Sequence, residues 1–105
     1  MKRGAEPVFD EVIHAPMRLR ICTLLGAVSS AEFAALRADL DVADSVLSKH
    51  LKTLSDAGYV TITKSRPSSG RPVTWAGLTT TGKRALASHI AALQDLVAQV
   101  DVAPN

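Results

Sequence analysis

Four polar residues recur at helical spacing within residues 42–58, at Ser45, Ser48, Lys49 and Lys52. Steps of three and four residues place all four side chains on one face of a helix. The opposite face would carry three leucines, Leu47, Leu51 and Leu54. Lysines on such a face can bind phosphates or guanine edges, and small hydroxyl side chains let the helix backbone approach the bases of DNA. An ordinary solvated helix face is the alternative, and the neighbouring segments favour the DNA-binding interpretation.

The residues that precede and follow this segment predict the rest of a helix-turn-helix. Upstream, Ser29 and Glu32 have the spacing of a capping box, which predicts a helix that begins at Ser29. The buried side of that helix would consist of Phe33, Leu36 and Leu40. The stretch 39–43 leaves room only for a tight turn into the second helix. Gly58 is placed to end the second helix in a left-handed conformation.

Two short segments with the composition and alternation of strands follow, at 59–63 and 73–78. The loop between them carries three cations, Lys64, Arg66 and Arg71, and no acidic residue. A basic hairpin tip can bind phosphates or insert an arginine into the minor groove of DNA. An ordinary polar hairpin loop is the alternative, because Gly, Pro and Ser commonly form turns. Next to the pair of helices, we interpret the hairpin as a wing that binds DNA together with the polar helix face.

Four segments, taken together, resemble the winged helix-turn-helix transcriptional regulators of the MarR/ArsR-like group. They are HAPMRLRICTLL at 14–25, LSKHLKTLSDAGYV at 47–60, GRPVTW at 70–75 and LTTTGKRAL at 78–86. The resemblance implies an α+β, mainly α fold with a two-stranded wing and a long C-terminal dimerisation helix. It also implies a homodimer that binds specific double-stranded DNA and regulates transcription, with repression as the expected role. Ala43 departs from the family, which often has a Ser or Thr helix cap there.

The C-terminal helix is predicted to begin at the N-cap Thr79 and to continue to about Val100. Its apolar residues form a heptad seam, at Leu86, Ile90, Leu93, Val97 and Val100. A domain this small cannot cover so long an apolar stripe, which would favour aggregation if it stayed exposed. We therefore expect a two-fold dimer that binds a pseudo-palindromic operator, built from this seam and from Phe9, Val12 and Ile13. The alternative is a helix that folds back over its own domain.

The 105 residues are expected to form one domain, with room for a modest core but not for a separate effector domain. Its parts would be an N-terminal helical segment (7–28), the helix-turn-helix (29–58), the wing (59–78) and the dimerisation helix (79–103). The net charge is only +2, but residues 44–72 carry five cations against two acids, whereas both charged residues of 85–105 are acidic. Basic charge is thus concentrated where nucleic acid is predicted to bind.

The single cysteine excludes an internal disulfide framework, as expected for a protein of the reducing cytosol. The sequence shows neither a signal peptide nor an apolar run long enough to span a bilayer, so we expect a cytoplasmic protein without membrane contact. A first helix is predicted to have Pro16 in its first turn and to end near residues 26–29, with its core side at Ile21, Leu24, Leu25 and Val28. Cys22 on this helix is expected to be a buried thiol rather than a redox switch.

Other chemistry has little support in the sequence. His14, His50 and His89 are far apart and have no neighbouring cysteine or paired carboxylate, so no metal site is predicted. Nucleophilic triads, glycine-rich phosphate loops and metal motifs are absent, so we expect neither an enzyme nor a cofactor. Two alternatives to DNA binding stay open: a protein–protein interaction module and a binder of structured RNA. A small-molecule effector also stays open, and it would bind at the dimer interface near Phe9, Ile13, Ile90 and Leu93.

Overall fold

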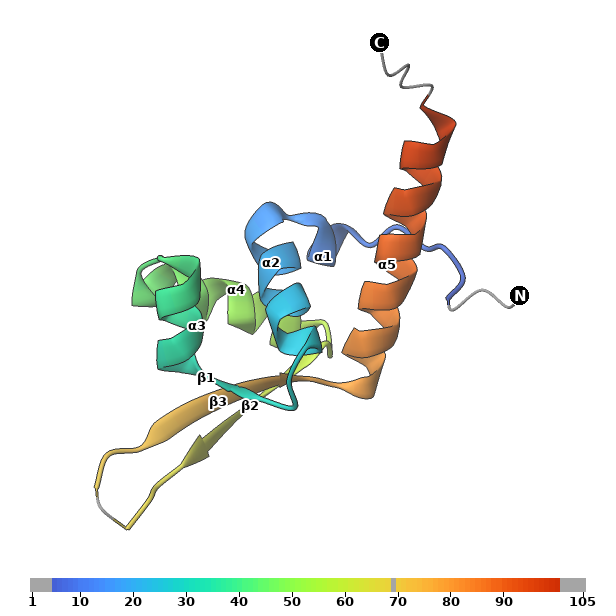
Figure 1. Cartoon of the computed structure of the whole chain (residues 1–105). Helices are drawn as coiled ribbons and strands as arrows, with labels where there is room; N and C mark the ends of the chain where they lie inside the picture. Colours follow the sequence, from blue (N-terminus) through green and yellow to red (C-terminus); the bar gives the residue numbers. More distant parts are fainter. Residues whose placement is uncertain (1–4, 69, 101–105) are drawn as a thin grey trace.

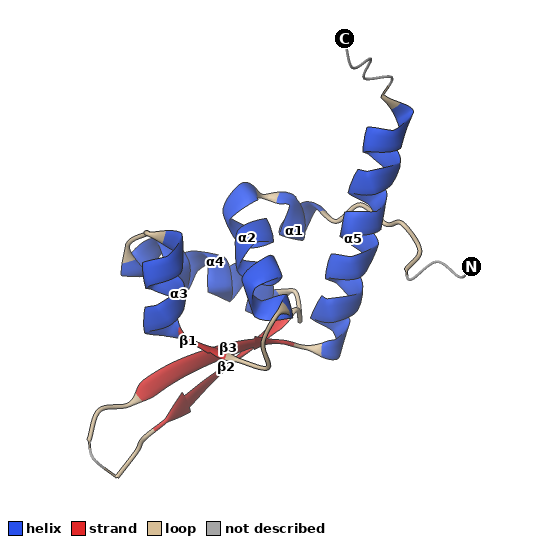
Figure 2. Ribbon diagram, in the orientation of Figure 1, coloured by secondary structure: helices blue, strands red, loops and turns tan. Residues whose placement is uncertain are grey.

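The computed structural model describes residues 5–68 and 70–100. Along this part of the chain the elements are α1 (Glu11–His14), α2 (Pro16–Gly26), β1 (Ala31–Glu32), α3 (Phe33–Leu40), α4 (Asp44–Asp56), β2 (Val60–Ser65), β3 (Val73–Leu78) and α5 (Thr80–Gln99). Figure 1 shows α2, α3 and α4 on one side of the small sheet, with α5 standing beside them. The β2–β3 hairpin projects at the end of the sheet away from α5, as the colouring by secondary structure makes clear (Figure 2).

The sheet has three antiparallel strands in the order β1-β3-β2. The two hairpin strands pair from Val60 with Leu78 to Ser65 with Val73, so the predicted wing is confirmed. The first strand is a feature that sequence patterns did not indicate. It places Ala31 opposite Ala76 and Glu32 opposite Trp75.

The capping box predicted at Ser29 is wrong. Residues Ala31–Glu32 are extended, α3 begins at Phe33, and its N-cap Glu32 makes no side-chain capping bond. The backbone of this short segment pairs with β3 instead of entering a helix. Gly77 permits the close approach, because a Cβ atom there would lie 2.8 Å from the carbonyl oxygen of Ser29. A tertiary contact therefore overrides the local capping signal.

The ends of α4 and α5 agree with the sequence. Helix α4 begins after Ala43, which makes no side-chain capping bond, and the chain leaves it through Gly58 with φ of +82°. Helix α5 has the predicted N-cap, because the Thr79 hydroxyl accepts a hydrogen bond from the Gly82 amide at 2.9 Å. The same hydroxyl donates to the carbonyl oxygen of Gly58 at 2.7 Å. One threonine thus fixes the start of α5 against the end of α4. The predicted C-terminal segment extends to residue 103, and residues 101–103 lie outside the described residues.

The hydrophobic core lies between the helices and the sheet. The three leucines predicted for the inner face of α4 are all buried, together with Leu36 and Leu40 of α3. On α2, Ile21, Cys22 and Leu25 are buried. The expectation that Leu24 and Val28 also belong to the core is wrong, because both side chains are exposed. Helix α2 ends at Gly26, so the helical spacing that would have aligned Val28 with Ile21 no longer applies there.

Candidate nucleic-acid interface

The structure exposes all seven residues that the sequence assigns to DNA binding. Four of them occupy the outer face of α4, and Lys64 lies near the end of β2. The other two, Arg66 and Arg71, lie in the loop that joins β2 to β3. The burial of Leu47, Leu51 and Leu54 on the inner face of α4 is what turns the polar face outward.

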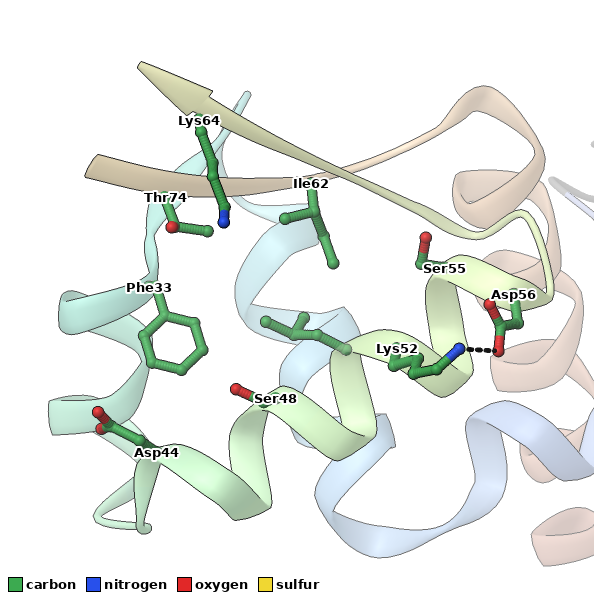
Figure 3. Close-up of a pocket in the computed structure, with 10 residues that line it drawn as sticks. Phe33, Asp44, Ser48, Lys52, Ser55, Asp56, Ile62, Lys64 and Thr74 are labelled. Atoms are coloured by element: carbon green, nitrogen blue, oxygen red, sulfur yellow. Dashed lines mark hydrogen bonds and ion pairs between the residues drawn. The ribbon is translucent and has the colours of Figure 1, made fainter. Parts of the chain in front are cut away.

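An open cleft of about 570 Å³ separates α4 from the hairpin (Figure 3). Phe33, Leu51 and Ile62 give this cleft an apolar lining. The hydroxyl groups of Ser48, Ser55 and Thr74 line it as well. Lys52 of α4 and Lys64 of β2 both line it, and Figure 3 shows the Lys52 side chain turned toward Asp56. An anionic, partly apolar polymer such as a sugar-phosphate backbone has the matching chemistry.

Two acidic residues, Asp44 and Asp56, also line the cleft, and each is paired with a cation. Arg37 Nε lies 2.9 Å from Asp44 Oδ1, which joins α3 to the first turn of α4. Lys52 Nζ lies 3.1 Å from Asp56 Oδ2, one helical turn along α4. All four side chains are substantially exposed, so these ion pairs contribute little to stability. A DNA phosphate can therefore replace Asp56 as the partner of Lys52 at a small cost in free energy.

A contact between α2 and α4, which the sequence did not indicate, helps to hold α4 in place. Arg18 on α2 donates through Nε to the carbonyl oxygen of Val12, and its Nη1 lies 3.2 Å from Nδ1 of His50 on α4. Arginine has only donors, so Nδ1 of His50 accepts. Burial lowers the pKa of His50, and the charges of Arg18 and Lys49 lower it further. No local pattern in the sequence points to Arg18 as the partner of His50.

The predicted dimer residues divide into two groups. Ile13 and Leu86 are buried in the core of their own chain, so they are not available for contact with a second copy. Val12 and Ile90 are partly buried and pack against the same core. Farther along α5, Leu93 is half-buried, whereas Val97 and Val100 are 68% and 60% exposed. Figure 1 shows this last part of α5 extending beyond the other helices. Phe9 is also exposed.

The structure brings together two histidines that lie 75 positions apart. Nδ1 of His14 is 3.2 Å from Nε2 of His89, so the expectation that the histidines are far apart is wrong for this pair. His89 is the buried polar residue of the core. Within the described residues, no group of three or more potential ligands could hold a metal ion.

Cys22 is completely buried, and burial raises the pKa of its thiol to about 11. Trp75 is half-buried and donates its indole N–H to Ser65 across the hairpin at 3.3 Å.

A hollow of about 280 Å³ lies between the N-terminal segment and α5, the two elements between which the sequence predicts an effector site. Its lining includes Val8, Asp10 and Arg84, and not the four residues named from the sequence. No helix of the described residues has both the length and the apolar character needed to cross a membrane.

Comparison with known proteins agrees with this geometry. Residues 17–97 match the family of the winged helix DNA-binding domain. The sequence matches none of the curated proteins compared with it. Among solved structures, the chain is similar to a transcriptional regulator homologue from Pyrococcus horikoshii OT3, with 24% identity and a TM-score of 0.83 over 89% of this chain and 91% of that one.

Two further structures are similar to most of this chain. One is a MarR family transcriptional regulator from Silicibacter pomeroyi, with 25% identity and a TM-score of 0.66 over 90% of this chain and 62% of that one. The other is a possible transcriptional regulator for arsenical resistance, with 27% identity and a TM-score of 0.67 over 88% of this chain and 95% of that one. The fold is thus that of transcriptional regulators of the MarR type. Since the family match extends from α2 into α5, the chain belongs to the winged helix DNA-binding domain family.

Proposed function

We propose that this protein binds a specific pseudo-palindromic operator as a homodimer and represses transcription in the cytoplasm. The observation that carries the proposal is the cleft between α4 and the hairpin, which Lys52 of α4 and Lys64 of β2 both line. The outer face of α4 would lie in the major groove, where Ser48 and Lys49 can approach base edges. The cleft would then receive one sugar-phosphate backbone, and the hairpin loop would reach the adjacent minor groove.

A single copy of this surface contacts only one half of a palindromic site. The last turns of α5 support pairing with a second copy, because Leu96, Val97 and Val100 form an exposed apolar surface that the rest of the described chain does not cover. Two-fold pairing through this surface would present two α4 helices to DNA about one turn apart, ~34 Å.

A gel-shift experiment with genomic DNA fragments, titrated with salt, tests DNA binding. We expect wild-type protein to shift a subset of fragments in the presence of excess random DNA, with an affinity that falls steeply as salt rises. The double variant Lys52→Ala, Lys64→Ala should lose most of this binding. Lys83→Ala removes an exposed lysine of α5, away from the cleft, and serves as the matched control.

Three results would contradict the proposal. Wild-type protein that prefers no fragment over random DNA would favour the protein-interaction alternative. Equal binding of duplex RNA with the same sequence would favour the RNA alternative, because the deep, narrow major groove of RNA does not admit α4. Increased transcription from the bound promoter in a purified system would contradict repression.

Sedimentation at micromolar concentration tests the dimer. Wild-type protein should sediment at about twice its mass of 11.1 kDa. Val97→Glu should sediment as a monomer, because pairing would bury two unpaired carboxylates. Val97 is exposed in the single chain, so the variant should keep its fold, which circular dichroism can check. Ala98→Glu adds the same charge on the side of α5 that faces away from Leu96 and Val100, and should remain dimeric. A monomeric wild type contradicts the dimer.

A further inference from the structure

His89 on α5 is completely buried, and both of its ring nitrogens contact the N-terminal segment. Nδ1 lies 2.9 Å from the backbone nitrogen of Asp10, and Nε2 lies 3.2 Å from Nδ1 of His14. A backbone amide can only donate, so Nδ1 of His89 carries no proton. The neutral ring then holds its proton on Nε2 and donates it to Nδ1 of His14. This bonding pattern requires both rings to be neutral.

Other contacts gather around the histidine pair. The amide of Val8 donates to the carbonyl oxygen of Ser88 at 3.1 Å, which adds a second bond between the N-terminal segment and α5. The ring of Phe9 packs against both imidazoles, with centroids 4.6 Å from His14 and 4.8 Å from His89. The Asp10 carboxylate caps α1 and accepts from the Tyr59 hydroxyl. Residues 5–10 are therefore held on α5 by two backbone amides, one bonded to Ser88 and one to His89.

A proton added to either ring breaks this pattern. A charged His89 would direct an N–H group from Nδ1 at the Asp10 amide. A charged His14 would direct an N–H group from Nδ1 at the one on Nε2 of His89. The charges that act on His89 are those of His14 and Asp10. Cys22 and Tyr59 lie near Asp10, and Glu6, Lys83 and Arg84 lie with Ser88 between the N-terminal residues and α5. The Asp10 carboxylate is already bonded to the Ile13 amide and the Tyr59 hydroxyl.

The charge balance at His89 agrees with this geometry. Burial lowers the pKa of His89, the neighbouring His14 lowers it further, and Asp10 only partly opposes the change. The unfolded value is about 6.5. A histidine whose pKa is lower in the folded state stabilises the fold fully above the unfolded value and loses this contribution as pH falls below it.

We propose that His89, bonded through Nδ1 to the Asp10 amide and through Nε2 to His14 of α1, is an acid-sensitive latch that holds residues 5–10 on α5 and opens when its ring takes up a proton. Ile13 is buried in the core and keeps α1 in place, so the change is confined to residues 5–10 and the surface of α5 beneath them. Opening uncovers His89 and the side of α5 that Phe9 packs against. The latch is a property of the single chain and stands independently of DNA binding and dimerisation.

Amide hydrogen exchange measured by NMR between pH 8 and pH 5 tests the latch. After correction for intrinsic rates, the protection of the Val8 and Asp10 amides should fall severalfold between pH 7.5 and pH 5.5, up to the limit of about tenfold that the uptake of one proton with an ordinary pKa of about 6.5 allows. The amides of Leu51 and Leu54 in α4 should keep their protection, because the core does not depend on the latch. The proposal is overturned if the amides of Val8 and Asp10 lose no protection, or if those of Leu51 and Leu54 lose as much.

Two variants identify the titrating group. His89→Asn keeps an acceptor oxygen near the position of Nδ1 and cannot take up a proton, so protection of Asp10 should become independent of pH. His50→Asn removes a histidine outside the latch and should respond to pH like the wild type. If His89→Asn fails to fold, the nitrogen-15 chemical shifts of the histidine rings in the wild-type protein show which ring nitrogen of His89 carries the proton. At pH 7.5 they should show Nδ1 of His89 without a proton, and a protonated Nδ1 overturns the latch.

Discussion

Nη1 of Arg18 lies 3.2 Å from Nδ1 of His50, and the same guanidinium donates to the carbonyl oxygen of Val12. One side chain on α2 thereby contacts both α1 and α4. The position of α4 relative to the rest of the domain depends on this contact as well as on the buried leucines. Arg18 is thus a positioning residue for the proposed DNA-binding face, although no pattern in the sequence marks it.

Replacing Arg18 with Gln should change two measurable properties. The pKa of His50 should rise toward its ordinary value, because one of the two neighbouring cations that lower it is removed. The free energy of unfolding should fall by about 1–3 kcal/mol, since charge-assisted hydrogen bonds are removed. An NMR titration and urea unfolding measure these effects. Arg20→Gln, an exposed neighbour on α2, should leave both unchanged. An unchanged pKa of His50 in Arg18→Gln would contradict the assignment.

Replacing Lys49 with Ala should reduce discrimination between operator and random DNA. The loss should be about 1–3 kcal/mol if Lys49 contacts a guanine edge from the exposed face of α4. Competition binding at fixed salt measures it, with Lys83→Ala as the control lysine on α5. Equal losses of specific and non-specific affinity would show that Lys49 binds only phosphate.

Replacing Arg71 with Ala should weaken binding to all DNA sequences alike. Arg71 lies in the exposed hairpin loop, where phosphate or minor-groove contacts are expected. The slope of log K against log salt should decrease in magnitude by about 1 for each phosphate that the variant no longer neutralises in a half-site. Filter binding over a range of salt concentrations measures the slope. A variant with the wild-type slope but altered sequence preference would instead assign base recognition to Arg71.

Replacing Gly82 with Ala should destabilise the fold, whereas Gly26→Ala should be tolerated. A Cβ atom at Gly82 would clash with the carbonyl oxygen of Tyr59, which accepts a hydrogen bond from the Thr79 amide. Backbone must move to relieve this clash, at a cost of about 1–3 kcal/mol. A Cβ atom at Gly26 would meet Leu86 at an ordinary 3.5 Å. Urea unfolding of the two variants decides, and equal stability would contradict the predicted clash.

The thiol of Cys22 should be almost inert in the folded protein. Its pKa of about 11 leaves about one thiol in a thousand ionised near pH 8, and the side chain is fully buried. Reaction with a disulfide reagent should therefore be at least a hundredfold slower than in protein unfolded by urea. Equal rates in the two states would mean that the thiol is accessible and would reopen a redox role.

Local sequence patterns predict the elements that carry the proposed DNA-binding face. Leu47, Leu51 and Leu54 were predicted to be buried, and the structure buries all three. Thr79 and Gly58 were predicted to begin α5 and end α4, and both do so. These features depend on local periodicity and capping chemistry, which act over a few residues and can be recognised in any chain.

Contacts between segments that are distant in the sequence could not be predicted from local patterns. The heptad seam could not show that Leu86 packs in the core of its own chain while Val97 stays exposed, because periodicity gives a face and not its partner. The strand at Ala31–Glu32 exists because β3 supplies hydrogen-bonding groups beside it. The His14–His89 contact joins residues that no local pattern connects. Such contacts depend on the path of the whole chain, since each is formed by segments that approach only after the core has packed.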